Sequence, residues 1–191
     1  MTQDDGATTD EREDTGLHPA LLATLIALPV ALIVGFVVAA VMANRTPVRE
    51  PIALGTVPAP RAESNACTDL LGALPESFDT FTRGELADPA PAGAVAWQSD
   101  DSADPIVLRC GLDRPVDFDQ AARLDVVNGV QWFQVSGADQ GIPASTWYVV
   151  DREVYAAATI PDGTGPTPLQ ALADAVNAAL PQTPLDPAPI R

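Results

Sequence analysis

The sequence has no lysine, one histidine and two cysteines, and these shortages exclude several kinds of site. His18, the only histidine, lies in the polar N-terminal stretch, so the rest of the chain cannot build a Ser-His-Asp triad, a Cys-His pair or a histidine-ligated zinc site. Cys67 and Cys110 lie far apart, which excludes a C-x-x-C motif. Dinucleotide-binding, P-loop and G-x-S-x-G motifs are also missing. We therefore expect no metal, no cofactor and no catalytic residue, and we predict that the protein is not an enzyme.

Positive charge is scarce as well. Ten basic residues, all of them arginine, stand against 26 acidic residues, and the formal net charge is −16 at pH 7. Proteins that bind nucleic acid present a basic surface to the phosphates, so we exclude a nucleic-acid partner. Residues 1–18 are polar and acidic without hydrophobic periodicity, and this composition predicts a disordered tail.

Residues 19–43 form a long uncharged run in which Thr24 is the only hydroxyl-bearing residue. A helix over this run would rise roughly 36 Å at about 1.5 Å per residue, enough for a bilayer core of about 30 Å. The run predicts a single transmembrane helix. A signal peptide cleaved near Ala43 is the alternative, although the run is longer than such a peptide needs and an acidic stretch precedes it.

Two signals for the orientation of this predicted helix disagree. Arg45 and Arg49 follow the run and Arg12 precedes it, so the positive-inside rule favours a cytoplasmic domain by one arginine. Two cysteines that can pair favour an oxidising exterior. We expect a protein of the cell membrane with a cytoplasmic N-terminus and an extracytoplasmic domain. Residues 44–65 contain four prolines, which predicts a linker that holds this domain off the membrane.

Both cysteines are predicted to face the core of the domain. Cys67 opens a helix expected over 67–74, where apolar residues recur at helical spacing. Cys110 lies in Pro105–Gly111, a run that alternates as a strand and turns Cys110 to the apolar face. We therefore predict a disulfide between Cys67 and Cys110. Two buried free thiols are the alternative.

Asn128-Gly129 is the strongest hairpin signal of the chain. A two-residue turn there pairs Asp125 with Trp132 and places Trp132 on one face with Arg123 and Asp125. The large indole is then either covered by another element, the interpretation that we favour, or exposed in a contact surface formed by Trp132, Arg123 and Asp125. The opposite face is predicted to be the core face, with Ala122, Leu124, Val126, Phe133 and Val135.

Three further elements complete the expected domain. Thr146–Val150 and Val154–Ile160 are rich in strand-forming residues and predict a second hairpin, while Ala94–Gln98 gives a weaker strand signal. A capping box at Thr167 opens a C-terminal helix that Pro181 ends.

The predicted fold class is α+β. We expect an antiparallel sheet of five to six strands with two helices packed on one face, preceded by one transmembrane helix and a Pro-rich linker. The domain covers residues 66–181, and residues 182–191 form a loose Pro-rich tail.

Signals for a polar site are weak. Asp100, Asp101 and Asp104 form an acidic loop, but their spacing is not that of a calcium loop, so we interpret them as solvated side chains. Arg109 and Arg114 are a candidate anion site, and pairing with nearby surface carboxylates is the simpler interpretation.

Several short segments follow one another in a recognisable order. They are Cys67 to Leu71 with Leu74-Pro75, Pro91 to Trp97, Pro105 to Gly111, Asn128-Gly129-Val130 with Trp132, and Val154 to Pro161. Together they resemble the actinobacterial domain-of-unknown-function family thirty-five fifteen over about residues 66–161. The resemblance implies a single-pass membrane or secreted envelope protein with paired cysteines, and it implies no activity, substrate or catalytic residue.

The functional hypothesis is a membrane-anchored envelope protein that acts as a non-catalytic binding module. Its expected partners are the membrane through the anchor, and an envelope protein or a cell-wall component through the domain. One alternative is an accessory subunit docked on a larger membrane complex through its transmembrane helix. The other is a hydrolase that uses paired carboxylates.

Overall fold

The computed structural model describes residues 19–43 and 49–190, and within the first range it describes side chains for residues 27–39 only. Helix α1 spans Pro19–Ala43, and its described side chains are all exposed, Leu32 and Phe36 among them. The disordered tail predicted over residues 1–18 lies outside the described residues.

The predicted transmembrane helix needs correction. Within the part of the chain that the structure describes, no helix combines the length and the apolar character that crossing a bilayer requires.

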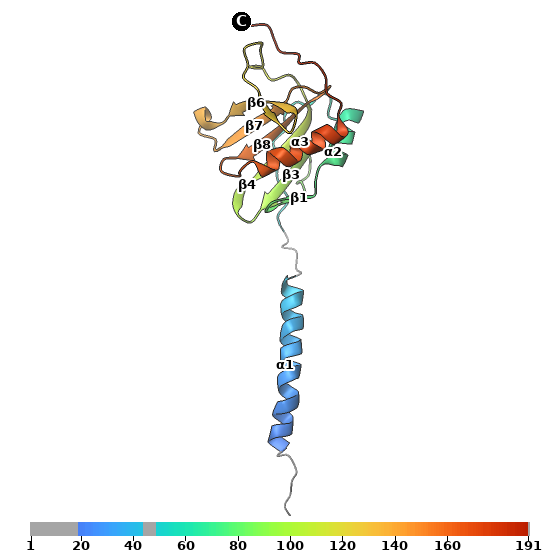
Figure 1. Cartoon of the computed structure of the whole chain (residues 1–191), viewed down its shortest axis with the longest axis vertical. Helices are drawn as coiled ribbons and strands as arrows, with labels where there is room; N and C mark the ends of the chain where they lie inside the picture. Colours follow the sequence, from blue (N-terminus) through green and yellow to red (C-terminus); the bar gives the residue numbers. More distant parts are fainter. Residues whose placement is uncertain (1–18, 44–48, 191) are drawn as a thin grey trace, which may run out of the picture. The chain divides into compact units, whose positions relative to one another are not determined.

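The second unit of the chain, from Arg49 onward, is built on one eight-stranded antiparallel sheet (Figure 1). The strand order is β1-β2-β3-β4-β8-β7-β6-β5, so the two longest hairpins lie side by side at the centre. The strands are β1 (Ser77–Phe78), β2 (Phe81–Arg83), β3 (Ala94–Ser99), β4 (Ser102–Leu112), β5 (Asp125–Val127), β6 (Val130–Ser136), β7 (Ala144–Val149) and β8 (Tyr155–Pro161).

The predicted number of five to six strands is wrong, and the sheet has eight. The additional strands are short. β1 has two residues and β2 has three, so neither is long enough to show an alternating pattern in the sequence. They become strands because β3 offers β2 a free edge, where Thr82 pairs with Gln98.

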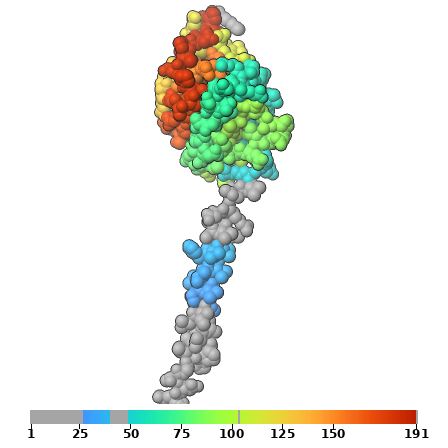
Figure 2. All heavy atoms as spheres, turned by 90° about the vertical axis from the view of Figure 1, so that its right-hand side faces the viewer, coloured from blue at the N-terminus to red at the C-terminus, as the bar shows by residue number. Residues whose placement is uncertain are grey.

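Two helices cover one face of this sheet, α2 (Asn65–Ala73) and α3 (Thr167–Ala179). They lie against each other, as the adjoining teal and red atoms of Figure 2 show. Ser64 caps α2 by accepting a hydrogen bond from the backbone N–H of Cys67 at 3.3 Å. The main core lies between these helices and the sheet. Its fully buried members include Leu70, Trp97, Ile106, Leu108, Val130, Trp132, Leu172 and Val176.

The opposite side of the sheet, called here the helix-free face, is partly covered by two extended segments. Residues 49–62, called the N-terminal strap, begin with Arg49 and bury Ile52 against Ala96 and Val107. The backbone of Ile52 pairs with residues 85–87. From residue 49 onward the predicted linker is therefore part of the domain, while residues 44–48 lie outside the described residues.

The C-terminal segment also belongs to the domain. Ala188 exchanges backbone hydrogen bonds with residues 118–120, and Asp186 pairs with Arg114. These contacts replace the loose tail expected from the prolines of residues 182–191. The prolines suit an extended segment, since an extended segment needs few backbone donors.

The hairpin at Asn128-Gly129 has the predicted register, with Asp125 opposite Trp132. The predicted core face is confirmed in part: Ala122, Leu124, Phe133 and Val135 pack together on the helix-free face, but the larger core lies on the opposite face of β6. Trp132 is fully buried under the helices, and Val126 is 67% exposed. Phe133 packs on Phe118 in a smaller cluster on the helix-free face. Both faces of β6 carry apolar residues, so alternation alone could not tell which face the helices cover.

The connection between β7 and β8 contains a buried ion pair. Asp151 and Arg152 have 0% and 6% of their surface exposed, and their charged groups approach to 2.8 Å. Arg152 also donates a hydrogen bond to Asn177 of α3 at 2.6 Å, and Gln182 donates one to Asp151. The turn that joins the central strands is therefore attached to α3 and to the C-terminal segment.

Candidate functional site

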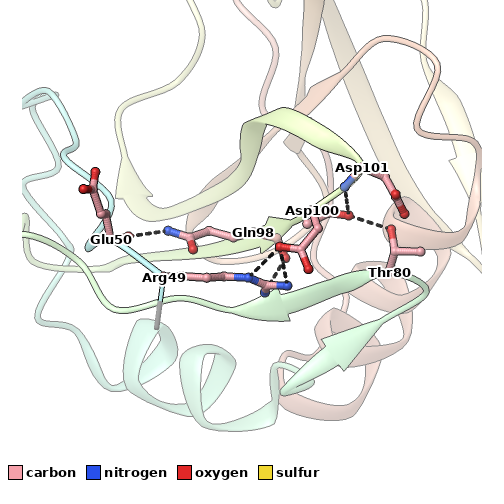
Figure 3. Close-up of polar contacts among 7 residues, drawn as sticks. Arg49, Glu50, Thr80, Gln98, Asp100 and Asp101 are labelled. Atoms are coloured by element: carbon pink, nitrogen blue, oxygen red, sulfur yellow. Dashed lines mark hydrogen bonds and ion pairs between the residues drawn. The ribbon is translucent and has the colours of Figure 1, made fainter. Parts of the chain in front are cut away.

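The turn between β3 and β4, called the hairpin tip and comprising residues 98–102, separates two hollows of about 360 Å³ and 310 Å³, of which the second is mainly polar. Figure 3 shows the side chains that meet there. Asp100 and Asp101 form the exposed end of the hairpin, and Ser99 is buried.

The first hollow lies between the hairpin tip and the start of the N-terminal strap. The guanidinium of Arg49 approaches the carboxylate of Asp100 to 3.1 Å and donates to the backbone oxygen of Gln98 at 3.2 Å. Gln98 in turn donates to the backbone oxygen of Glu50 at 2.9 Å (Figure 3). These contacts hold the Arg49 side chain against the hairpin tip, where Arg49 lines the hollow.

The second hollow lies on the other side of the hairpin tip and is lined by hydrogen-bond acceptors. Asp79, Asp101 and Asp162 line it together with four hydroxyl-bearing residues, Thr80, Ser99, Ser102 and Thr164. Ser99 donates to the hydroxyl of Thr80 at 2.8 Å and accepts from the backbone N–H of Asp101 at 3.2 Å (Figure 3). Such a lining suits ligand groups that donate hydrogen bonds, such as hydroxyls and amines.

The three aspartates predicted to share one loop do not act as one group, and Asp104 lies in strand β4. Asp100 is paired with Arg49, and the backbone oxygen of Asp104 accepts from Ser102 at 2.9 Å. Over the described ranges, no set of three potential metal ligands is arranged to hold an ion.

Arg109 and Arg114, the two arginines considered for an anion site, are each engaged separately. Arg109 donates to the backbone oxygen of Gly55 in the strap at 3.2 Å, and Arg114 approaches the carboxylate of Asp186 to 3.2 Å. Burial lowers the pKa of Arg109, and the nearby Tyr148 partly offsets this effect. Burial likewise raises the pKa of Tyr148. The two arginines do not form a joint site.

The three residues of the predicted contact surface are placed differently from one another. Arg123 is exposed, Asp125 is half-buried and Trp132 is completely buried. A partner cannot reach Trp132, so these residues do not form one surface around an exposed indole.

The predicted disulfide is confirmed. Cys67 of α2 and Cys110 of β4 are bonded, and both are completely buried. The bond joins a helix to the central part of the sheet across 43 residues of chain. Each cysteine lies on the apolar face that its local periodicity predicted.

Sequence reasoning did not identify Arg49, Asp79 or Asp162 as lining residues. They come from three distant segments, so no spacing links them. The only sequence signal was the polar loop at Asp100 and Asp101 itself.

The comparisons with known proteins give a family and no activity. Residues 26–185 match the family described as Protein of unknown function (DUF3515). This match covers most of the chain. Neither the curated proteins nor the solved structures that were compared include a match. This chain therefore belongs to the DUF3515 family of proteins of unknown function.

Proposed function

We propose that the domain from Arg49 onward works outside the cytoplasm as a non-catalytic binding module of the cell envelope. Its partner is an envelope protein or a cell-wall component. The observation that carries the proposal is the buried disulfide between Cys67 and Cys110. Structural disulfides form and persist in oxidising compartments and are rare in the cytosol.

The residue inventory of the domain supports binding over catalysis. Residues 49–190 contain no histidine, and both cysteines are in the disulfide. The nucleophile–base pairs that activate serine or cysteine depend on such groups in most enzymes. What the domain offers instead is a surface with a polar hollow beside Asp79, Asp101 and Asp162, and with the strap and the C-terminal segment held in place by hydrogen bonds.

The compartment is tested with a reporter cysteine. Val126→Cys places a thiol at a position that is 67% exposed, and the wild-type chain is the control because its own cysteines are paired and buried. A maleimide that cannot cross membranes is applied to intact cells. We expect labelling of the variant and none of the wild type. Labelling of the variant only after permeabilisation would contradict an extracytoplasmic domain.

The binding role is tested by photo-crosslinking in intact cells from a series of exposed positions on the domain. We expect one neighbouring protein or the cell wall to be recovered repeatedly from adjacent positions and lost from positions on other faces. Recovery of nothing above the level of an inert exported protein, from every position, would reject a binding module.

A further inference from the structure

Three segments that are distant in the sequence meet around Val116. Residues 57–58 of the strap, residues 112–116 after β4 and Tyr148 of the helix-free face line a hollow of about 260 Å³. A second hollow of about 170 Å³ lies between residues 116–119 and residues 188–189. Val116 lines both hollows and therefore forms the crest between them.

The crest is apolar and exposed. Val116 is 77% exposed, the highest fraction among the large apolar side chains of the domain that the structure describes, and Val57 is 44% exposed. Pro58 and Pro115 add apolar surface in the larger hollow. We call the surface made by residues 57–58, 113–119 and 188–189 the Val116 surface.

The backbone beneath the crest is held in place. Phe118 is 1% exposed and packs on Phe133 with ring centroids 5.6 Å apart. Its backbone oxygen accepts from Ala188 at 2.9 Å, and Gln120 donates to Ala188 at 3.0 Å. A partner that covers Val116 therefore orders little additional chain, which lowers the entropy cost of binding.

Acidic residues outnumber basic residues around the crest. Asp113 lines the larger hollow, and Asp117 and Asp119 line the smaller one. Arg114 is the basic residue of this segment, and its charge is paired with Asp186. Among the described residues, none of the three aspartates takes part in an ion pair. The Val116 surface therefore combines apolar contact area with uncompensated negative charge.

We infer that the Val116 surface binds a segment of a partner protein in which apolar side chains are flanked by lysine or arginine. This inference rests on the proposed binding function and names the surface and the chemistry of the partner. The apolar side chains would occupy the larger hollow beside Val116, and the basic groups would meet Asp113 and the two aspartates of the smaller hollow. A second copy of this chain is disfavoured, because it would bring two sets of aspartates together.

The experiment selects peptides from a library of random 12-residue sequences on the full chain. Val116→Asp removes the exposed apolar side chain and adds a further negative charge to the Val116 surface. The triple variant Asp113→Asn/Asp117→Asn/Asp119→Asn removes the three negative charges of this surface. Val126→Asp is the matched control, since Val126 is similarly exposed on β5. We expect selected peptides to be rich in basic and apolar residues, and to bind each of the two surface variants at least about tenfold more weakly, which corresponds to about 1.4 kcal/mol. Binding to the control should be unchanged, and salt should weaken binding to the wild type.

Three outcomes would overturn the inference: no enrichment above background, enriched peptides without basic residues, or equal binding to Val116→Asp. Self-association that Val116→Asp abolishes, measured by sedimentation, would assign the surface to a second copy instead. These failures are separable from failure of the proposed function. If crosslinking in cells still recovers a partner from other positions of the domain, the proposed binding function is retained. Only the assignment of the Val116 surface as the binding surface is then rejected.

Discussion

Two glycines with nearly the same backbone conformation serve different purposes. Gly111 has φ +85°, and a Cβ at this position would overlap the backbone of Arg61 and Ala62 in the strap. Gly129 has φ +82° in the β5–β6 turn, with open space around it. At Gly111 the missing side chain permits close packing of the strap, whereas at Gly129 it serves only the turn.

We expect Gly111→Ala to destabilise the domain by about 3 kcal/mol or more, because left-handed strain adds to the overlap with the strap. Gly129→Ala, the control, should cost about 1 to 2 kcal/mol from strain alone. Urea unfolding of the full chain measures both. Equal losses for the two variants would show that the strap does not press on Gly111.

Breaking the buried ion pair of Asp151 and Arg152 should destabilise the domain more than breaking an exposed ion pair. Arg152→Met leaves the carboxylate of Asp151 buried without its cation, which should cost about 3 to 5 kcal/mol. Glu76→Gln breaks the exposed pair with Arg83, in which Glu76 is 81% exposed, and should cost at most about 1 kcal/mol. Thermal unfolding compares the two. A small loss for Arg152→Met would mean that water or the chain compensates Asp151.

Tyr148 predicts a fall in stability at alkaline pH. Burial raises the pKa of the folded phenol above the ordinary value of 10.0. The unfolded phenol therefore ionises first as the pH rises, and stability is lost progressively above about pH 10. Tyr148→Phe should make this fall shallower between pH 8 and 11, as measured by the urea midpoint. Parallel curves for the wild type and the variant would contradict this assignment.

At the scale of elements, the disulfide attaches α2 to the sheet. Its two cysteines are 43 residues apart, so in the chain-entropy model the bond contributes about 4 kcal/mol. α2 has only nine residues and needs such a tertiary attachment, because short helices are marginal alone.

We expect Cys67→Ala/Cys110→Ala to lose about 4 kcal/mol of stability. The wild-type chain under reducing conditions should lose a similar amount, and the reductant should not affect the variant. Thermal unfolding with and without reductant measures this. A variant as stable as the oxidised wild type would show that packing alone holds α2 on β4.

At the scale of the whole molecule, negative charge dominates. The chain carries a formal charge of −16, and the described residues contain four ion pairs. Repulsion among the remaining carboxylates favours the expanded chain. We therefore expect the unfolding temperature to rise as NaCl increases from low to physiological concentrations, where the Debye length shortens to about 8 Å. A calorimetric scan that is independent of salt would contradict this expectation.

The positions of short-range features followed from the sequence. The pairing of Asp125 with Trp132 was predictable because a two-residue Asn-Gly turn determines the register. The inward direction of Cys67 and Cys110 was predictable because helical and strand periodicities are local. These two directions were compatible with a disulfide and with two buried free thiols, and the structure shows the disulfide.

The candidate site was predictable only in part. Asp100 and Asp101 were visible as a polar loop, but Arg49 was assigned to a linker and Val116 was not singled out. Arg49 reaches Asp100 across 51 residues of chain, a contact that no local pattern encodes.

By itself the sequence determined the local elements: the apolar helix at 19–43, the Asn128-Gly129 hairpin and the faces of the two cysteines, because each depends on neighbours within a few residues. The number of strands, the face that buries Trp132 and the convergence of three segments on Val116 became visible only in the folded domain. Short strands form only where another strand offers an edge, and an apolar residue becomes core or surface according to what packs on it. Both depend on contacts between residues that are far apart in the chain.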